Sequence, residues 1–175
     1  KQEIFTELSK DYISGITFSG GDPLHENNLN EVLLLIQEIR TSYPDKTIWL
    51  YTGYTWDQIM DYSFYDSMSK FPNNTFEYAD IEIKRRVIAK ECDVLVDGEY
   101  IDEQKDLTLK WRGSNNQRVI DVQATLAQDD ITVPVLHCGD HDDIPMGRET
   151  ATAPVADIEE NIVNFKGSSR KCCDA

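Results

Sequence analysis

The sequence predicts an α/β domain whose strands pair mostly in parallel. Three short apolar stretches, residues 15–20, 47–52 and 92–98, each end in a turn that contains glycine. Helical patterns follow the first two stretches, and strands that alternate with helices are typical of parallel βαβ units. At 175 residues with 40% hydrophobic side chains, the chain is long enough for one domain with a substantial core.

The first part of the chain predicts a helix, a strand and a second helix. Residues 1–12 carry apolar side chains at helical spacing, and the strand 15–20 follows them. Asn28 and Glu31 have the spacing of a capping box, in which each side chain bonds to the other residue's backbone. The apolar face that follows predicts a helix that ends near Ser42, because Pro44 cannot continue it.

The second unit repeats this order. Residues 47–52 are β-branched and aromatic, which predicts a buried strand that stops at Gly53. Thr55 and Gln58 form a second capping-box pattern at the start of a short helix. Its apolar face consists of Trp56, Ile59 and Met60.

The chain between the second and third strands interrupts this order. Residues 62–79 are rich in aromatic and polar side chains, which predicts a loop. Such a loop is either a lid or partner surface, or a loop held by its own rings, and the second is commoner. Residues 80–91 return to a helical pattern, and residues 92–98 predict the third strand.

The last part of the chain is less regular. Residues 100–110 are polar, and a turn with an arginine and three amides follows at 111–117. Amides and guanidinium groups hold loops together more often than they bind ligands. After an apolar stretch at 119–122 the pattern fades, so we expect a core over residues 1–126 and an acidic, largely disordered tail over 127–175.

Composition narrows the classes of partner. A net charge of −15 disfavours nucleic acid as a partner, and no apolar run approaches the roughly 20 residues of a membrane helix. The four cysteines and three histidines show no metal-ligand spacing and are too few for a disulfide scaffold. We therefore expect a cytoplasmic protein with free cysteines and no membrane partner.

Three glycine turns predict a binding site at one edge of the sheet. Parallel strands place the turns after them at the same edge, where backbone groups can reach a ligand that carries an ammonium and a carboxylate group. Asp22 and Asp97 can add acceptors for amino or hydroxyl groups. The sequence shows no catalytic triad, no phosphate-binding loop and no dinucleotide fingerprint, so no catalytic residue is assigned and any chemistry is expected to come from a cofactor.

Four blocks resemble the activating proteins of anaerobic ribonucleoside-triphosphate reductase, a family of radical S-adenosylmethionine enzymes. They are residues 19–25 (SGGDPLH), 48–54 (IWLYTGY), 94–98 (VLVDG) and 111–117 (WRGSNNQ). The resemblance implies a partial, open (βα) barrel that holds a [4Fe-4S] cluster and S-adenosylmethionine. It also implies generation of a glycyl radical on the large reductase subunit, with an electron donor such as flavodoxin or ferredoxin.

The resemblance also implies which residues bind the cofactor. The turn from Ser19 to Pro23 matches the segment that holds the amino group of the methionine moiety. The loop 52–54 matches one that lies near the ligand, and Asp97 is carried over from the third block. The implied S-adenosylmethionine-binding residues are Ser19, Gly20, Gly21, Asp22, Pro23, Thr52, Gly53, Tyr54 and Asp97. The role of residues 111–117 stays open between a contact with the reductase and closure of the barrel.

One departure from the family concerns the cluster. The family's C-x-x-x-C-x-x-C loop precedes the matched region, and the sequence given has no such motif. Three thiolates that leave one iron open are what the chemistry requires. We therefore expect the chain as given to bind no cluster and to be inactive alone. Either the ligands lie in a missing N-terminal segment, which the start of the sequence in mid-pattern favours, or the protein itself is inactive. The alternatives are an activase of another glycyl-radical enzyme, such as formate lyase, and a cluster-less binding module.

Overall fold

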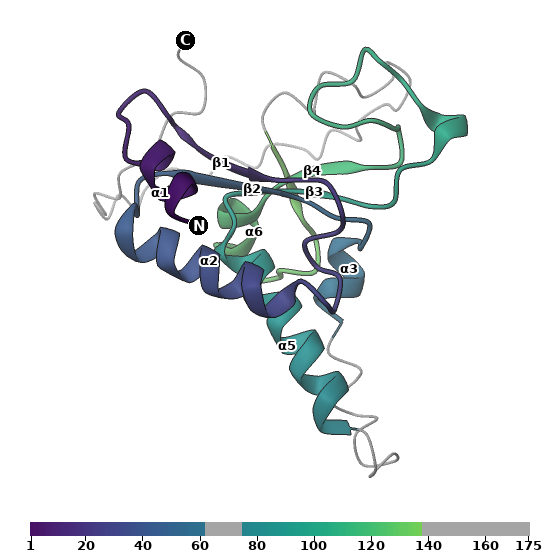
Figure 1. Ribbon diagram of the computed structural model, residues 1–175. Helices are drawn as coiled ribbons and strands as arrows, with labels where there is room; N and C mark the ends of the chain where they lie inside the picture. Colours follow the sequence, from purple (N-terminus) through teal and green to yellow (C-terminus); the bar gives the residue numbers. More distant parts are fainter. Residues whose placement is uncertain (62–74, 138–175) are drawn as a thin grey trace, which may run out of the picture.

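A computed structural model describes residues 1–61 and 75–137. Five strands form an open sheet in the order β1-β2-β3-β4-β5, with the helices drawn in Figure 1. The elements in chain order are α1 (Gln2–Leu8), β1 (Gly15–Phe18), α2 (Leu29–Ser42), β2 (Thr47–Tyr51), α3 (Trp56–Ile59), α5 (Thr75–Glu91), β3 (Val94–Asp97), the 3₁₀ turn η2 (Asp102–Gln104), β4 (Arg118–Asp121), α6 (Val122–Leu126) and β5 (Val135–Leu136).

The α/β class is confirmed, and the sheet is parallel over its first three strands but not in its last two pairings. β1 pairs with β2 and β2 with β3 in parallel, as the repeated unit predicts. β4 runs antiparallel to β3, and β5 antiparallel to β4. The direction reverses because a loop without a crossover helix joins β3 to β4, and such a connection returns the chain along the neighbouring strand.

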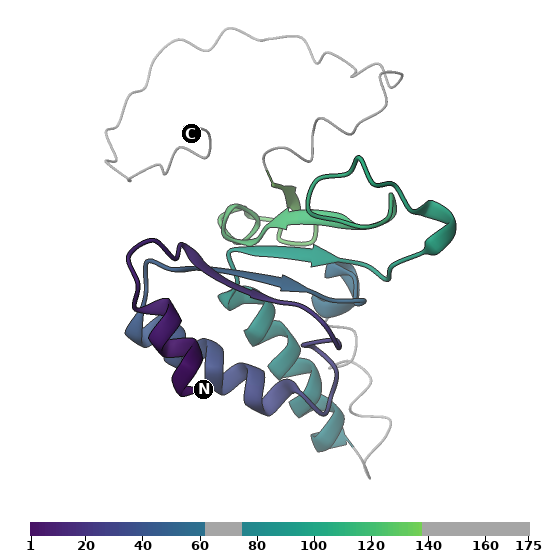
Figure 2. The same cartoon turned by 45° about the horizontal axis from the view of Figure 1, so that its top comes forward.

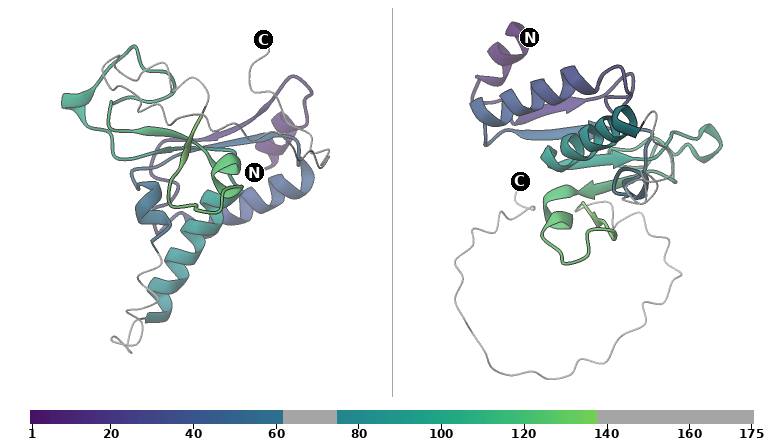
Figure 3. Two further views of the ribbon diagram at one scale, coloured as in Figure 1. Left: turned by 180° about the vertical axis from the view of Figure 1, so that it is seen from behind. Right: turned by 90° about the horizontal axis from the view of Figure 1, so that it is seen from below.

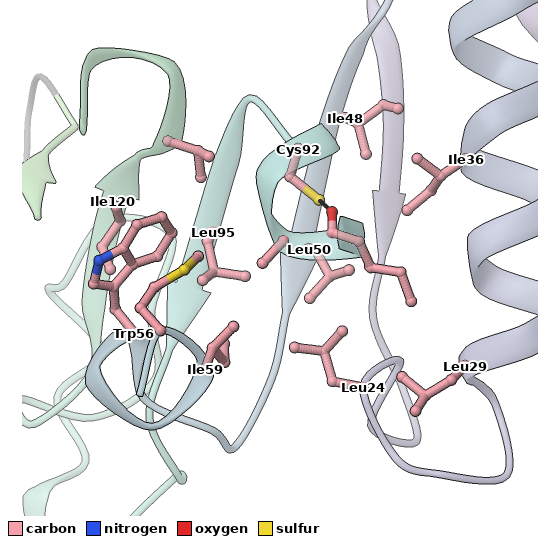
Figure 4. Packing of buried hydrophobic residues seen from close by; sticks show 14 of the residues in the cluster. Leu24, Leu29, Ile36, Ile48, Leu50, Trp56, Ile59, Cys92, Leu95 and Ile120 are labelled. Carbon is pink, nitrogen blue, oxygen red and sulfur yellow. Dashed lines mark hydrogen bonds between the residues drawn. The ribbon is translucent and has the colours of Figure 1, made fainter. Parts of the chain in front are cut away.

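The helices cover one face of this sheet, and the core lies between the two layers. α2 and α5 pack against each other beneath β1, β2 and β3 (Figure 2). Figure 4 shows the packing, in which Ile48 and Leu50 of β2 meet Ile36 of α2, while Trp56 and Ile59 lie beside Leu95 and Ile120. Burying each of these side chains contributes about 1.5–3 kcal/mol to folding. Within the described residues, none of the helices is long and apolar enough to span a membrane.

Of the two predicted capping boxes, the one at Thr55 is present and the one at Asn28 is not. Thr55 and Gln58 form the predicted capping box, with both reciprocal bonds present. The capping box predicted at Asn28 is wrong, because its side chain makes no cap bond and its amide donates to the carbonyl oxygen of Asp22 at 2.8 Å. The helix nevertheless runs over Leu29–Ser42 and ends where Pro44 predicts.

The limits of the predicted loop and tail also need correction. α5 begins at Thr75, so the last residues of the predicted 62–79 loop belong to a helix, and residues 62–74 lie outside the described part. The fold continues past residue 126, because β5 pairs with β4 and the Ile131 carbonyl accepts a bond from the Trp56 indole at 2.7 Å. Residues 138–175 are not described, so the disordered tail stays a prediction.

Gly15 permits the close approach of β1 and β2. A Cβ atom at this position would lie 2.0 Å from the carbonyl oxygen of Thr47, its register partner. We predict that Gly15→Ala lowers the free energy of unfolding by about 3 kcal/mol, because the two strands would have to separate. Denaturant unfolding measures this loss. Thr17→Ala, on an exposed position of the same strand, is the control and should change stability by less than about 1 kcal/mol.

Candidate functional site

The turn after β1 presents unfilled space beside two glycines. We call residues 19–25 the first turn, residues 52–54 the second turn and residues 97–98 the third turn. Gly20 and Gly21 have φ angles of +82° and +56°, which side chains rarely adopt, and a Cβ at either would meet no atom within 4 Å. Within the described part of the chain, their N–H groups donate to no other residue. The first turn can therefore bind a ligand through its backbone.

Asp22 joins the first turn to the second. Its carboxylate accepts a bond from the Thr52 hydroxyl at 2.8 Å and one from the Gly53 N–H at 2.9 Å. It also accepts the Leu24 N–H of its own turn at 2.9 Å. Because these donors belong to both turns, the carboxylate fixes the path of the first turn relative to the second. Its oxygen atoms are engaged with these three donors, which makes positioning of the turns its observed role.

Backbone hydrogen bonds join the second turn to the third turn and to the end of β3. The Thr52 N–H donates to the Val96 carbonyl at 3.0 Å, and the Gly98 N–H donates to the Tyr54 carbonyl at 3.2 Å. The three glycine turns thus lie at one sheet edge, in one hydrogen-bonded series. That arrangement is what parallel pairing of the first three strands predicts.

Asp97 lies at the centre of a buried ion pair. Its side chain is 1% exposed and contacts the Arg118 guanidinium at 2.6 Å, and it also accepts the Trp56 N–H at 2.6 Å. Arg118 also pairs with Asp57, and these carboxylates raise the pKa of Arg118 above its usual value. Asp97 is therefore occupied by residues of the chain itself. It holds the start of β4 and the start of α3 against the third turn.

Arg85 of α5 supports the first and second turns from the helix side. Its Nε donates to the Leu24 carbonyl at 3.0 Å, and one terminal nitrogen donates to the Tyr54 hydroxyl at 2.7 Å. The guanidinium also stacks over the Tyr54 ring, 4.2 Å from its centroid. The sequence offered no sign of this contact, because Arg85 lies in an ordinary helical pattern far from both turns.

The amide-rich segment 111–117 holds its own loop and fastens it to the third turn. The Gln117 side chain accepts the Gly113 N–H at 2.9 Å and donates to the Gly98 carbonyl at 2.9 Å. The Asn116 amide donates to the Glu99 carbonyl at 2.7 Å. Holding the loop, which the sequence favoured as the commoner use, is confirmed for these two amides.

A hollow of about 410 Å³ lies beside the first turn. Ser19, Gly20 and Pro23 line it together with side chains of α1, β1 and α2. Thr52, Gly53, Tyr54 and Asp97 do not line this hollow, which opens at the free edge of β1. The turns are thus joined by hydrogen bonds, while the hollow itself belongs to the first turn.

The described residues do not supply ligands for a [4Fe-4S] cluster. No group of three or more histidine, cysteine or acidic side chains is close enough to hold a metal ion in the described ranges. Cys92 lies fully buried in the core, and burial raises the pKa of its thiol well above the usual value (Figure 4). A thiol in that setting does not become the thiolate that binds iron.

Comparison with known families gives this geometry its context. Residues 1–120 match the family described as the 4Fe-4S single cluster domain. The chain belongs to that family. No solved structure matches the chain significantly.

Curated relatives confirm the resemblance found in the sequence. The relatives from Vibrio cholerae, Enterobacteria phage T4 and Escherichia coli K12 are each named anaerobic ribonucleoside-triphosphate reductase-activating protein. The first is 41% identical over 103 residues, which cover 59% of this chain and 52% of the relative. The other two are 35% identical over 67% and 68% of this chain, and over 60% and 64% of their own lengths. The chain thus spans between half and two thirds of the length of these relatives.

We predict that Asp22→Ala lowers the free energy of unfolding by about 2–3 kcal/mol, because three donors lose a charged acceptor. Amide hydrogen exchange should also quicken at Leu24 and Gly53, the two N–H groups that the carboxylate holds. Glu26→Ala, an exposed carboxylate in the same region, should leave both measurements unchanged. Unchanged exchange at Gly53 in the Asp22 variant would contradict the assigned role.

We predict that Arg118→Met destabilises the fold by about 3–5 kcal/mol, because Asp97 would keep a buried charge without its cation. Asp57→Ala removes only the exposed partner of Arg118 and should cost less than about 1 kcal/mol. Urea unfolding of the two variants measures the difference. An equal loss in the free energy of unfolding for both variants would show that the Arg118–Asp97 pair contributes no more to stability than the exposed Arg118–Asp57 pair.

Proposed function

We propose that this chain forms the S-adenosylmethionine-binding part of an activating enzyme that generates a glycyl radical on anaerobic ribonucleoside-triphosphate reductase. The observation that carries the proposal is the first turn. Gly20 and Gly21 there have open space beside them, and their N–H groups donate to no other described residue. Asp22 bonds this turn to the second turn. The names of the relatives support the choice of reductase. The sheet would then be part of an open radical S-adenosylmethionine barrel.

In this proposal the described residues bind and orient the cofactor. Ser19, Gly20, Gly21 and Pro23 would hold the methionine moiety through the backbone of the first turn. Asp22, Thr52 and Gly53 would keep the first two turns at a fixed separation, and Tyr54 and Asp97 would position the second and third turns. The radical chemistry would come from S-adenosylmethionine with the iron–sulfur cluster of the family, for which the described residues hold no ligand set.

The remaining parts of the assignment belong to the same proposal. The partner would be the large reductase subunit, and flavodoxin or ferredoxin would supply electrons in the cytoplasm. Nucleic acid is disfavoured by the net charge of −15. Activation of another glycyl-radical enzyme is the alternative within the same chemistry, and co-purification with a reductase subunit distinguishes the two.

We predict that the full chain binds S-adenosylmethionine, measured by isothermal titration calorimetry. Gly21→Val should weaken binding at least tenfold, because its side chain enters the open space and its backbone rarely adopts a φ of +56°. Glu26→Ala is the control and should bind as the unchanged chain does. Absence of binding by the unchanged chain would overturn the proposal.

Iron and sulfide analysis completes this test. After anaerobic reconstitution the chain as given is expected to hold no cluster, and about four irons per chain would contradict that expectation. S-adenosylmethionine binding without iron would assign the cofactor turns to this chain and the cluster ligands elsewhere.

A further inference from the structure

Each nitrogen of the Arg85 guanidinium group has a different partner in the chain. Nε donates to the Leu24 carbonyl of the first turn at 3.0 Å, and one terminal nitrogen donates to the Tyr54 hydroxyl of the second turn at 2.7 Å. The other terminal nitrogen pairs with Glu82 of the same helix at 2.7 Å. A planar fork with fixed donor directions can hold three acceptors at set positions, which an ammonium group on a flexible stem cannot do.

The contact with the first turn lies directly after the two open glycines. The Leu24 N–H donates to the Asp22 carboxylate and the Leu24 carbonyl accepts from Arg85, so this residue is bonded on both sides. Its side chain is also fully buried. The N–H groups of Gly20 and Gly21 donate to no other residue in the described ranges. The conformation of the two glycines therefore depends on how firmly the residues after them are held.

The contact with the second turn reaches the third turn through one residue. The Arg85 guanidinium lies over the Tyr54 ring, 4.2 Å from its centroid, and bonds to its hydroxyl. The Tyr54 carbonyl in turn accepts the Gly98 N–H of the third turn at 3.2 Å. Loss of the Arg85 side chain would therefore release the end of the first turn and the ring of the second turn together.

α5 carries Arg85 at a fixed place. Figure 3 shows α5 beside α2 on the helix-covered side of the sheet, where the two helices pack against each other. Ile88 and Ala89, one turn further along α5, are buried in the core. The buried Arg86 donates to the Ile59 carbonyl at 2.9 Å. A side chain on a packed helix can hold two turns at a set separation, whereas a side chain on a loop would move with that loop.

The charge of Arg85 is balanced where it lies. Glu82 pairs with the guanidinium, and 12% of the Arg85 side chain is exposed. Because opposite charges in contact cancel at longer range, the guanidinium adds little attraction for a ligand carboxylate at the turns. The effect of Arg85 on ligand binding is therefore expected through geometry rather than through charge.

We propose that Arg85 is a positioning residue, which holds the first and second turns in the arrangement that a ligand with an ammonium and a carboxylate group requires. It acts through Leu24 and Tyr54 and does not itself touch the ligand. The inference rests on the proposed function, because S-adenosylmethionine is the ligand assigned to these turns. It adds a helix residue, outside all three turns, on which the affinity for that ligand depends.

The test is calorimetry of the full chain with S-adenosylmethionine, at a temperature where urea unfolding shows each variant to be folded. Arg85→Met keeps an aliphatic stem and removes the donors, and we expect it to weaken binding about tenfold or more. Arg85→Lys keeps the charge without the fork and should recover little of the affinity. Lys84→Met removes the adjacent cation of α5, which pairs with Asp80, and should bind as the unchanged chain does.

A double-mutant cycle tests the route through Tyr54. Tyr54→Phe removes the hydroxyl acceptor and keeps the ring. If Arg85 acts through that hydroxyl, the affinity losses of Tyr54→Phe and Arg85→Met will not add, and the double variant will bind about as weakly as Arg85→Met alone. Additive losses would overturn this route.

Amide hydrogen exchange separates the inference from the proposed function, because it needs no ligand. The Leu24 N–H donates to the Asp22 carboxylate, and the His25 N–H donates to the Asp22 carbonyl at 3.0 Å. We expect both N–H groups to exchange faster in Arg85→Met and at the unchanged rate in Lys84→Met.

The outcomes distinguish the two claims. Absence of S-adenosylmethionine binding by the unchanged chain would remove the proposed function, while faster exchange in Arg85→Met would still support its role in holding the first turn. A lower free energy of unfolding with unchanged affinity in Arg85→Met would mean a structural role alone and would overturn the inference. Unchanged exchange at Leu24, or full affinity in Arg85→Lys, would overturn it as well.

Discussion

The carboxylate of Asp22 is the interaction on which the arrangement of the site depends. It bonds the segment after β1 directly to the segment after β2, through Thr52 and Gly53. Parallel pairing alone brings the two strand ends to one edge, but it leaves the turns free to open in any direction. The Asp22 carboxylate, which accepts bonds from three donors in the two turns, fixes the orientation of one turn relative to the other. The same turn is anchored in the core by Leu24, which is fully buried.

The sequence predicted those parts of the fold that depend on local patterns. The first three strands, the parallel pairing and the capping box at Thr55 follow from spacing within short windows. The reversed direction of β4 could not be read in this way, because the 98–117 connection has no pattern that states where it returns. β5 was missed because a strand of two residues carries no periodicity. Asn28 failed as a cap because a carbonyl of the first turn offered its amide another partner.

For the site, the sequence identified the turns but not what holds them. Glycine spacing pointed to Gly20, Gly53 and Gly98, and the hydrogen bonds place their turns in one series. Asp22 and Asp97 were expected to face a ligand, and both are engaged with residues of the chain. Arg85 and Arg118 were not recognised, since a cation in a helix or at a strand start has many uses. Contacts between residues far apart in the chain carry no local signal.

The antiparallel return of β4 has a consequence for how this protein can vary. Because β4 starts at the edge where β3 ends, the two ends of the connection, Gly98 and Gln117, lie next to each other at the sheet edge. Its far portion, around Leu107, can therefore gain or lose residues without altering strand register. The length and chemistry of this excursion can therefore change while β3 and β4 keep their pairing.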